Sequence, residues 1–310
     1  MEETIIASLL PIVVTLFLGF FAGWHHDFDS KQGAVLNRMV MLYALPLTLF
    51  AGMMGVERAT LLQQGTMALL LVIGMVGGYA AVFIVSRYLF RVASKVAALQ
   101  ALAIAGPAVP FVGVPVLGFL YGGLSTVPIA LCSIIMNLVQ VPITLLILSH
   151  GAADSAGGNK TFLANIKTTL KEPVVWSPIL AFILLLLNVH IPGQIRSSLQ
   201  LLGSATGGVA LFASGIILYS YHVSLNLTVV LSVLAKNILL PGLILLCGLA
   251  MGVIGNTLNI SVVTLAIPTA SICVILAVQY HTAEQEMAST LFFSTICSII
   301  TMGGLLIYLH

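Results

Sequence analysis

Residues 106–115 read Gly-Pro-Ala-Val-Pro-Phe-Val-Gly-Val-Pro and lie inside a long apolar stretch, 97–121. Three prolines and two glycines in ten residues exclude a continuous α-helix, because each proline lacks an N–H group and displaces the carbonyl four residues before it. The carbonyls of Ala103, Gly106 and Phe111 are therefore freed. Unpaired backbone is costly in hydrocarbon and persists only where it is buried in protein or lines a polar cavity. The stretch predicts an interrupted membrane helix beside such a cavity.

A second apolar stretch, 260–280, has a milder break at Ala-Ile-Pro-Thr-Ala-Ser, residues 266–271. Pro268 frees the carbonyl of Thr264, and Thr269 and Ser271 place hydroxyl groups beside it. A lone transmembrane proline is more often a structural kink than a site. Two interrupted helices at matching positions in two halves of a chain, however, are a strong pointer to the midplane site of a secondary transporter. Half-helix N-termini suit a carboxylate, and freed carbonyls suit a cation.

The composition places both stretches in a lipid bilayer. The 310 residues include 11 Lys and Arg and 9 Asp and Glu, whereas 60% are hydrophobic, and the mean hydropathy is +1.16. A soluble globule needs more surface charge than this. The chain is therefore predicted to be a polytopic α-helical membrane protein, which excludes a soluble enzyme, a secreted disulfide scaffold, a disordered chain and an outer-membrane barrel. The net charge of +2 does not suggest a nucleic-acid partner.

Apolar runs long enough to cross a bilayer recur along the chain. The acidic start, Met1-Glu-Glu-Thr, is unlike a cleaved signal peptide, so the first run is expected to be a retained span. The longest hydrophilic segment, Gly151 to Glu172, is predicted to be a flexible linker whose part 161–170 forms a short surface helix. The ten candidate spans are 4–24, 36–55, 66–88, 97–121, 126–148, 174–190, 202–222, 227–254, 260–280 and 288–309.

Positive charge predicts the orientation. With the N-terminus outside, eight Lys and Arg fall in cytoplasmic connections and only Arg58 and Arg196 fall outside. Both termini then face outward, the linker 151–172 is cytoplasmic, and each half, 1–150 and 173–310, contains five spans. An odd number of spans duplicated in tandem must insert in opposite orientations, so the halves are predicted to be inverted repeats.

Polar side chains form a stripe on the fifth span and another on the tenth. Asn137 and Gln140 are the members that are hardest to hide in lipid, and two alternatives remain for them: contact with a solute, or hydrogen bonds that hold helices together. The other positions at the same helical spacing are Ser133 and Thr144 on the fifth span, and Thr290, Ser294, Ser298 and Thr301 on the tenth.

Lys236 is the one charged residue well inside a predicted span. If that helix starts near Leu227, Lys236 lies about 13 Å along its axis. An intramembrane charge indicates a functional role by default, here to attract an anionic solute or to replace a coupling sodium ion. The alternative is that the helix starts later and Lys236 extends to the cytoplasmic interface.

Motifs of other functional classes are absent from the sequence. The seven histidines lie at predicted span ends or in connections without ligand spacing, and the four cysteines lie in apolar runs as expected of packing residues. The chain has neither a Walker loop nor a Gly-x-Ser-x-Gly motif, so no cofactor, metal or ATP coupling is expected.

The chain resembles the auxin efflux carrier family, in its bacterial branch of small-dicarboxylate (malonate-type) carriers. The resemblance covers nearly the whole chain. It rests on Tyr43-Ala-Leu-Pro-Leu-Thr-Leu-Phe50, Phe111-Val-Gly-Val-Pro115, Lys171-Glu-Pro-Val-Val-Trp-Ser-Pro178 with the apolar run to Ile191-Pro192, Gly207 to Leu218, Lys236 to Pro241, and Ala266-Ile-Pro-Thr-Ala270.

The resemblance implies ten transmembrane helices in two inverted five-helix repeats, the fold of sodium/proton antiporters and bile-acid symporters. It also implies an elevator-like cycle around crossed, broken helices four and nine. Many members have an asparagine seven residues before the proline that matches Pro115, whereas this chain has Ala108. Backbone groups are therefore an alternative means of binding. The candidate substrate-binding residues are Pro107, Ala108, Val109, Pro110, Gly113, Asn137, Gln140, Lys236, Pro268, Thr269 and Ser271.

These observations predict a non-enzymatic secondary active transporter of a small organic anion in the bacterial inner membrane. A dicarboxylate such as malonate is the expected solute, and only the resemblance suggests it. The alternatives are a carrier of the same fold for a monocarboxylate or amphipathic weak acid, and a non-transporting membrane sensor or subunit. The coupling ion, sodium or proton, stays open, and so does the oligomeric state, including a homodimer.

Overall fold

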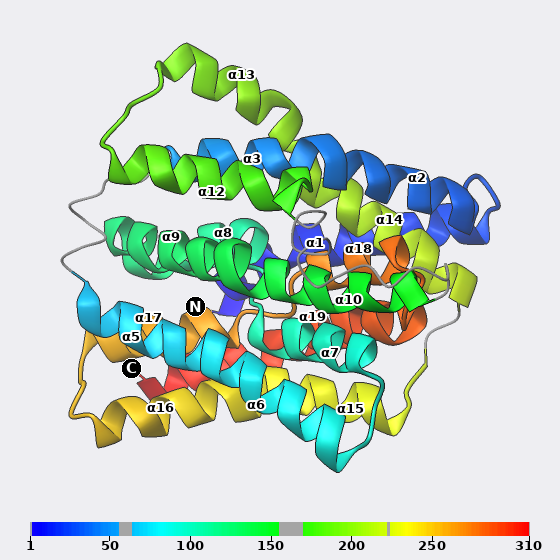
Figure 1. Cartoon of the computed structure of the whole chain (residues 1–310). Helices are drawn as coiled ribbons and strands as arrows, with labels where there is room; N and C mark the ends of the chain where they lie inside the picture. The colour runs from blue at the N-terminus through cyan, green and yellow to red at the C-terminus, as the bar shows by residue number, and fades with distance from the viewer. Residues whose placement is uncertain (1, 56–63, 155–169, 222–223, 310) are drawn as a thin grey trace.

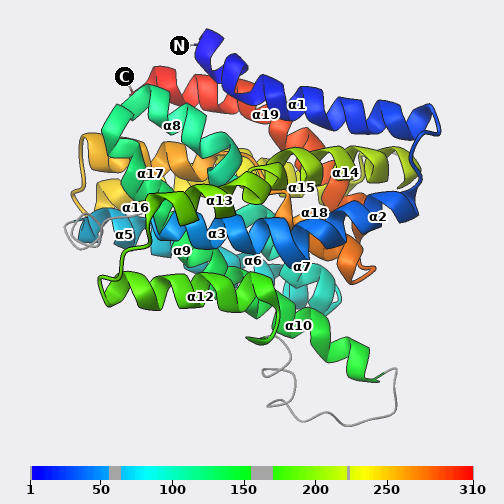
Figure 2. The same ribbon diagram turned by 90° about the horizontal axis from the view of Figure 1, so that it is seen from above.

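The computed structural model describes residues 2–55, 64–154, 170–221 and 224–309, and apart from one isolated bridge their regular structure is helical. The helices run roughly side by side, and α1 starts at the end of the bundle where α19 finishes (Figures 1 and 2). Within the described part, six helices are long and apolar enough to cross a membrane: Ser30–Met53, Gly65–Leu89, Val127–Ser149, Gly193–Ser220, Leu227–Ala250 and Glu284–Tyr308.

The other four predicted spans are a helix at the start of the chain, a 14-residue helix, and the two stretches with breaks. Three of the six long helices begin earlier than expected, at Ser30, Gly193 and Glu284. Pro192 stands immediately before the helix that begins at Gly193, a position that proline favours, and the amphipathic turns after it interrupt the apolar pattern. The predicted surface helix at 161–170 lies almost entirely outside the described residues.

One group of helices, called here the flanking bundle, consists of the first two spans and the sixth and seventh. Its most extensive helix–helix contact is between α1 and α14. Gly19 and Gly215 allow the two backbones to approach closely there, because a Cβ on either glycine would overlap the backbone of the other helix. Its members are α1 (Glu2–Trp24), α2 (Ser30–Met39), α3 (Leu45–Met53), α12 (Pro173–Leu186), α13 (Gly193–Gly203) and α14 (Ala205–Tyr221).

The remaining helices form the crossing bundle, which contains both broken spans. Its members from the first half are α5 (Gly65–Val72), α6 (Gly78–Ile84), α7 (Ser94–Ala105), α8 (Val114–Tyr121), α9 (Thr126–Ile135) and α10 (Val141–Asp154). Those from the second half are α15 (Leu227–Leu234), α16 (Leu240–Ala250), α17 (Asn256–Ala266), α18 (Ile272–Gln279) and α19 (Glu284–Leu309).

Four mid-span prolines follow a π-helical turn instead of breaking their helix. A π turn holds one extra residue and widens the helix, which relieves the clash between a proline ring and the carbonyl four residues back. Pro115 is one of them, so the first break is narrower than the sequence predicted: the chain is helical again from Val109. The turns and their prolines are Val40–Ala44 with Pro46, Val109–Gly113 with Pro115, Met136–Gln140 with Pro142, and Ala235–Leu239 with Pro241.

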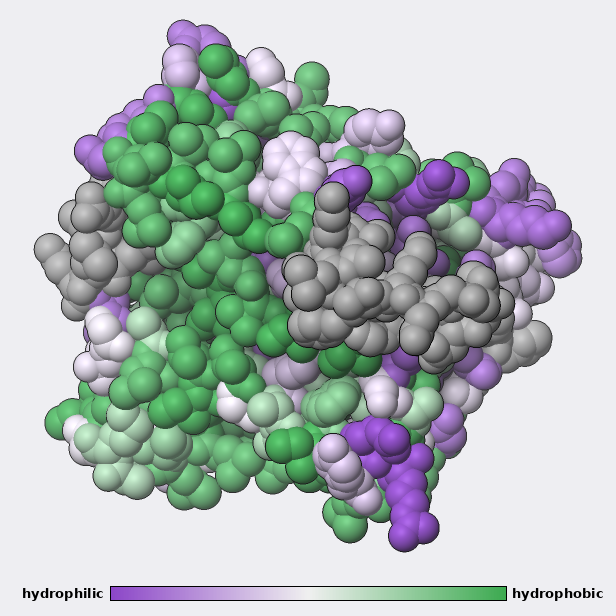
Figure 3. All heavy atoms as spheres, in the orientation of Figure 1, coloured by the Kyte–Doolittle hydropathy of each residue, from purple (hydrophilic) through white to green (hydrophobic). Residues whose placement is uncertain are grey.

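The surface supports insertion in a membrane. Apolar side chains cover the broad middle of the face in Figure 3, and hydrophilic ones gather toward the end where α2 begins and α6 leads into α7. These two segments contain Lys31 and Arg91, so positive charge is present at the end opposite the start of α1. Large exposed apolar side chains such as Leu201 and Leu246 fit contact with lipid.

Candidate functional site

The two breaks meet at the centre of the crossing bundle. α7 ends at Ala105 and α17 ends at Ala266, and the extended segments that follow pair as an antiparallel bridge between Pro107 and Thr269. The Ala108 N–H donates to the Pro268 carbonyl at 2.9 Å, and the Ala270 N–H donates to the Gly106 carbonyl at 3.1 Å. The predicted approach of the two interruptions is confirmed.

The second break supplies hydrogen bonds that the prolines of the first break remove. In an uninterrupted helix the Ala103 carbonyl would accept from residue 107, but Pro107 has no N–H; the Thr269 hydroxyl donates to it instead at 2.9 Å. Pro110 likewise leaves the Gly106 carbonyl free for the Ala270 N–H. Two of the three carbonyls predicted to be free before the first-break prolines therefore find partners across the crossing.

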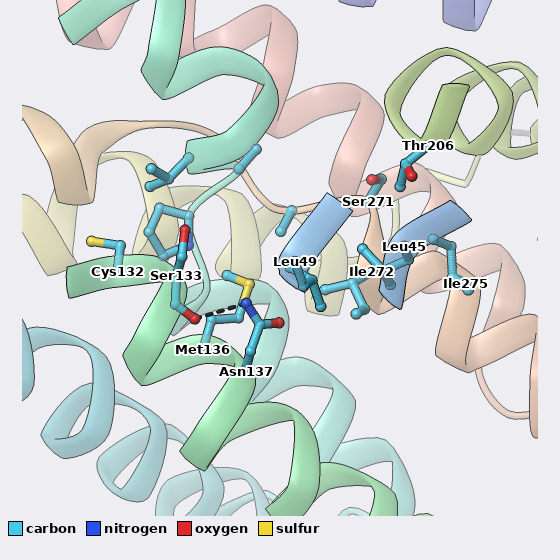
Figure 4. A pocket seen from close by; sticks show the side chains of 14 residues that line it. Leu45, Leu49, Cys132, Ser133, Met136, Asn137, Thr206, Ser271, Ile272 and Ile275 are labelled. Carbon is cyan, nitrogen blue, oxygen red and sulfur yellow. Dashed lines mark hydrogen bonds between the residues drawn. The ribbon is translucent and has the colours of Figure 1, made fainter. Parts of the chain in front are cut away.

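A cavity lies against the crossing, between the two bundles. It encloses about 470 Å³ of empty space, including the part open to solvent. Figure 4 shows the labelled side chains of α9 and its π turn on one side and those of α3, α14 and α18 on the other. The lining residues are Leu45, Leu49, Pro107, Ala108, Val109, Cys132, Ser133, Met136, Asn137, Thr206, Ala270, Ser271, Ile272 and Ile275.

The start of α18, which borders this cavity, has N–H groups without a hydrogen-bond partner among the described residues. Ser271 and Ile272 both line it, and no hydrogen bond from either N–H is formed within the described part of the chain. The Ser271 hydroxyl also makes no hydrogen bond there. A helix N-terminus has a partial positive charge and free donors, which suits an anion such as a carboxylate.

The fifth span contributes the polar wall of the cavity. The Asn137 amide nitrogen donates to the Ser133 carbonyl at 2.7 Å, and the amide oxygen points toward the middle of the cavity (Figure 4). Thr206 lies on the flanking side, where its hydroxyl is 3.0 Å from that of Thr48. The cavity therefore offers polar side chains from both bundles, while its lining contains no charged side chain.

Gln140 does not line the cavity, although its spacing placed it on the same face as Asn137. The π turn Met136–Gln140 has more residues per turn than an α-helix, so the angle between these two positions changes and Gln140 faces the crossing. Its amide nitrogen donates to the Ala105 carbonyl at 3.1 Å and to the Met75 carbonyl at 2.9 Å. Gln140 thus holds the end of α7, which corresponds to the second alternative given for it by the sequence.

The stripe on the tenth span divides in the same way. The Ser294 hydroxyl donates to the Asn237 amide oxygen at 2.7 Å and accepts from the Thr269 N–H at 3.2 Å, so it supports the second break. Ser298 and Thr301 bond to carbonyls of their own helix. The Thr290 hydroxyl is buried without a partner among the described residues.

Lys236 is fully buried in the middle of its span, and the helix begins at Leu227 as predicted. It therefore does not extend to the cytoplasmic interface. Its ammonium donates to the Leu265 carbonyl at 3.3 Å, one residue before the end of α17. It does not line the cavity.

A second, smaller cavity, with about 240 Å³ of empty space including the part open to solvent, lies against the crossing toward α14 and α19. It shares Ala108 and Ser271 with the first and adds the predicted residues Pro268 and Thr269. The two cavities together border most of the predicted residues; Gly113 lies elsewhere, packed near Ile267, and the Pro110 side chain is outside the described part.

Sequence reasoning missed the flanking wall, which contains Leu45, Leu49 and Thr206. Nothing in their local pattern distinguishes them from packing residues. Cys132 was interpreted as a packing residue, yet it also lines the cavity. The described residues contain no group of three His, Cys, Asp or Glu that could hold a metal ion.

Two long bundles of apolar helices, with a cavity between them at a pair of crossed, broken helices, define a membrane carrier. The sequence comparisons agree. Residues 4–306 match the family model described as membrane transport protein, and the chain belongs to this family, the auxin efflux carrier family.

Curated relatives are similar over almost their full length. The chain is 31% identical to the "Uncharacterized transporter YfdV" of Escherichia coli (strain K12) over 298 residues, which cover 96% of this chain and 95% of the relative. The proteins of the same description from Escherichia coli O157:H7 and Shigella flexneri match equally. Family and relatives are transporters, so the chain is not an enzyme.

Proposed function

We propose that this protein is a secondary carrier of a small organic anion, which binds in the cavity at the crossing. The observation that supports this proposal most directly is the pair of unbonded N–H groups of Ser271 and Ile272 at the cavity wall. Buried donors without acceptors are costly, and an arriving carboxylate oxygen would satisfy them.

Two polar side chains would complete the recognition. The Ser271 hydroxyl is available as a further donor, and the Asn137 amide can turn to present its NH₂ group to a carboxylate. Ala108 stands where many family members have asparagine, so backbone N–H groups of α18 take over the binding of the anion in this chain.

The cavity also favours a second candidate solute class. A dicarboxylate such as malonate is the expectation from the resemblance, but most of the lining is apolar, including Leu45, Leu49 and Met136. A monocarboxylate or an amphipathic weak acid would fit equally well, with its carboxylate at the α18 N-terminus and its apolar part against these side chains.

The transport cycle that we propose is alternating access of the elevator type, with ten spans in two inverted repeats and both termini outside the bacterial inner membrane. The cavity is walled by both bundles, so a shift of the crossing bundle along the flanking bundle would carry the solute with α18. The breaks at matching positions of the fourth and ninth spans support the internal repeat.

Uptake into proteoliposomes tests the solute class. Labelled malonate, succinate, oxalate, acetate and indole-acetate are compared with and without sodium and proton gradients. Saturable uptake of a carboxylate is expected, and uptake of none of these above protein-free vesicles would contradict the proposal.

Two variants at one position test the binding mode. Ser271 has φ −60°, which proline can adopt, so Ser271→Pro removes both the N–H group and the hydroxyl, whereas Ser271→Ala removes only the hydroxyl. We expect the proline variant to raise KM at least about tenfold, which is the effect of losing one charge-assisted hydrogen bond. The alanine variant should raise KM less. Equal KM values for Ser271→Pro and the wild type would place the anion elsewhere.

A further inference from the structure

Lys236 is the one charged side chain that is fully buried in the described part of the chain. It is the tenth residue of the 24-residue span Leu227–Ala250, so apolar helix extends on both sides of it and it lies near the middle of the span. Charged groups at this depth are costly unless another charge or a dipole offsets them.

The partners of Lys236 offset only part of one charge. The two ion pairs formed by described residues, His25 with Asp27 and His281 with Glu284, do not involve it. Its one hydrogen bond goes to the Leu265 carbonyl at the C-terminal end of α17, which has a partial negative charge of about half a unit. When it is protonated, Lys236 therefore has no full counter-charge among the described residues.

Lys236 lies next to the segment that forms part of the cavity wall. It donates to the Leu265 carbonyl, and α17 ends one residue later at Ala266. The chain that follows this end lines the cavity at Ala270, Ser271 and Ile272. Because no charged side chain lines the cavity itself, Lys236 stands behind the wall as the charge that an anion there would experience.

We propose that Lys236 is the resident counter-charge of the solute: in the loaded carrier its ammonium neutralises one negative charge, so the transported species is a singly charged organic anion. This inference rests on the proposed function. Lys236 and the solute would move together, because Lys236 holds α17 and the solute binds at α18. A monovalent anion then makes the loaded bundle electrically neutral, whereas a divalent anion leaves it with one negative charge.

Neutrality has a measurable consequence. If the loaded bundle has a net charge, the rate at which it moves through the membrane depends on the membrane potential. If the loaded bundle is neutral, this rate does not depend on the potential. Exchange of labelled for unlabelled solute at equal concentrations reports only the loaded forms. Monomethyl malonate, which has one carboxylate, and malonate, which has two, are nearly matched in size and serve as the pair of probes.

The experiment uses the full-length protein in proteoliposomes in sodium-free choline buffer, with the potential set by potassium and valinomycin. We expect wild-type exchange of monomethyl malonate to change less than about twofold when an inside-negative potential is imposed, and that of Lys236→Met at least about fivefold. Lys236→Arg keeps the charge and should behave as the wild type. The matched control is Lys95→Met, the same change near the N-terminal end of α7. Exchange of monomethyl malonate by this variant should not depend on the potential, as in the wild type.

Several outcomes would overturn the inference. They are potential-dependent exchange of monomethyl malonate in the wild type, the same independence in Lys236→Met, or a requirement for sodium. If the Met variant does not fold, wild-type protein decides alone: malonate exchange must respond to the potential while monomethyl malonate exchange does not. Absence of exchange for every organic anion would instead refute the proposed function.

Discussion

The flanking and crossing bundles are held together in different ways. In the flanking bundle α1 and α14 touch backbone to backbone at Gly19 and Gly215, so shape fixes their contact. In the crossing bundle the breaks free backbone groups, and buried polar side chains such as Thr269 and Gln140 satisfy them. The comparison teaches that a broken helix in an apolar interior needs specific hydrogen bonds, whereas a packed pair of whole helices needs only small residues.

The largest loss of stability is expected at the contact between α1 and α14 in the flanking bundle, where no space remains for a larger side chain. Gly215→Leu would force a side chain into the backbone of α1 near Leu16, and should destabilise the protein by about 3 kcal/mol or prevent its folding. Thermal unfolding in detergent measures the loss. Gly208→Leu on the same helix is the control, because nothing lies within 4 Å of the added Cβ. Equal stability of the two variants would show that α1 and α14 are not in backbone contact.

A second prediction addresses the hydrogen bonds of the crossing. Thr269→Val keeps the volume but removes the donor to the Ala103 carbonyl, which should cost about 1–3 kcal/mol and reduce transport. Thr290→Val on α19 is the control, because its buried hydroxyl has no partner among the described residues; this change should be neutral or stabilising. Both are read by thermal unfolding and by uptake. A loss in Thr290→Val as large as in Thr269→Val would contradict the distinction.

The third prediction concerns the polar wall where the bundles face one another. Asn137→Ala removes an amide whose oxygen points into the cavity, so KM should rise about three- to tenfold, the value of one neutral hydrogen bond. Its amide nitrogen bonds only to the Ser133 carbonyl of its own helix, so the unfolding temperature should change little. Gln140→Leu should show the opposite pattern, with lower stability because the Ala105 carbonyl loses its donor. If the two variants affect the same quantity, the π turn does not separate their roles.

The smallest effect is expected at Glu172, the residue immediately before α12. Burial raises the pKa of this carboxyl, and its charge interacts with Tyr280. A raised pKa in the folded state means that the charged form is disfavoured, so stability falls as the pH rises through the folded-state pKa. Glu172→Gln removes this penalty and should increase stability by less than about 1 kcal/mol at pH 7. The gain should vanish near pH 3, where the wild-type carboxyl is protonated in both the folded and the unfolded state. Thermal unfolding at the two pH values measures it, and an equal gain at both would exclude the ionisation of Glu172 as its cause.

Parts of the site could be predicted because proline chemistry is local. The missing N–H of Pro107 frees the Ala103 carbonyl wherever the chain folds, and the sequence indicated this. Pro115 was predicted to extend the same break, yet the helix widens into a π turn before it. The choice between breaking and widening depends on what neighbouring helices offer the freed carbonyls, and the residues around one proline do not contain that information.

By itself the sequence determined the membrane class, the presence of long apolar helices, the two interrupted helices and the unusual position of Lys236, because hydropathy, the absence of proline N–H groups and charge are properties of the residues. Only the tertiary structure decided that Thr269 replaces the N–H of Pro107, that Asn137 faces the cavity while Gln140 faces the crossing, and that Thr206 completes the opposite wall. These relations join segments up to 166 residues apart. They depend on the packing of one helix against another, which no local pattern specifies.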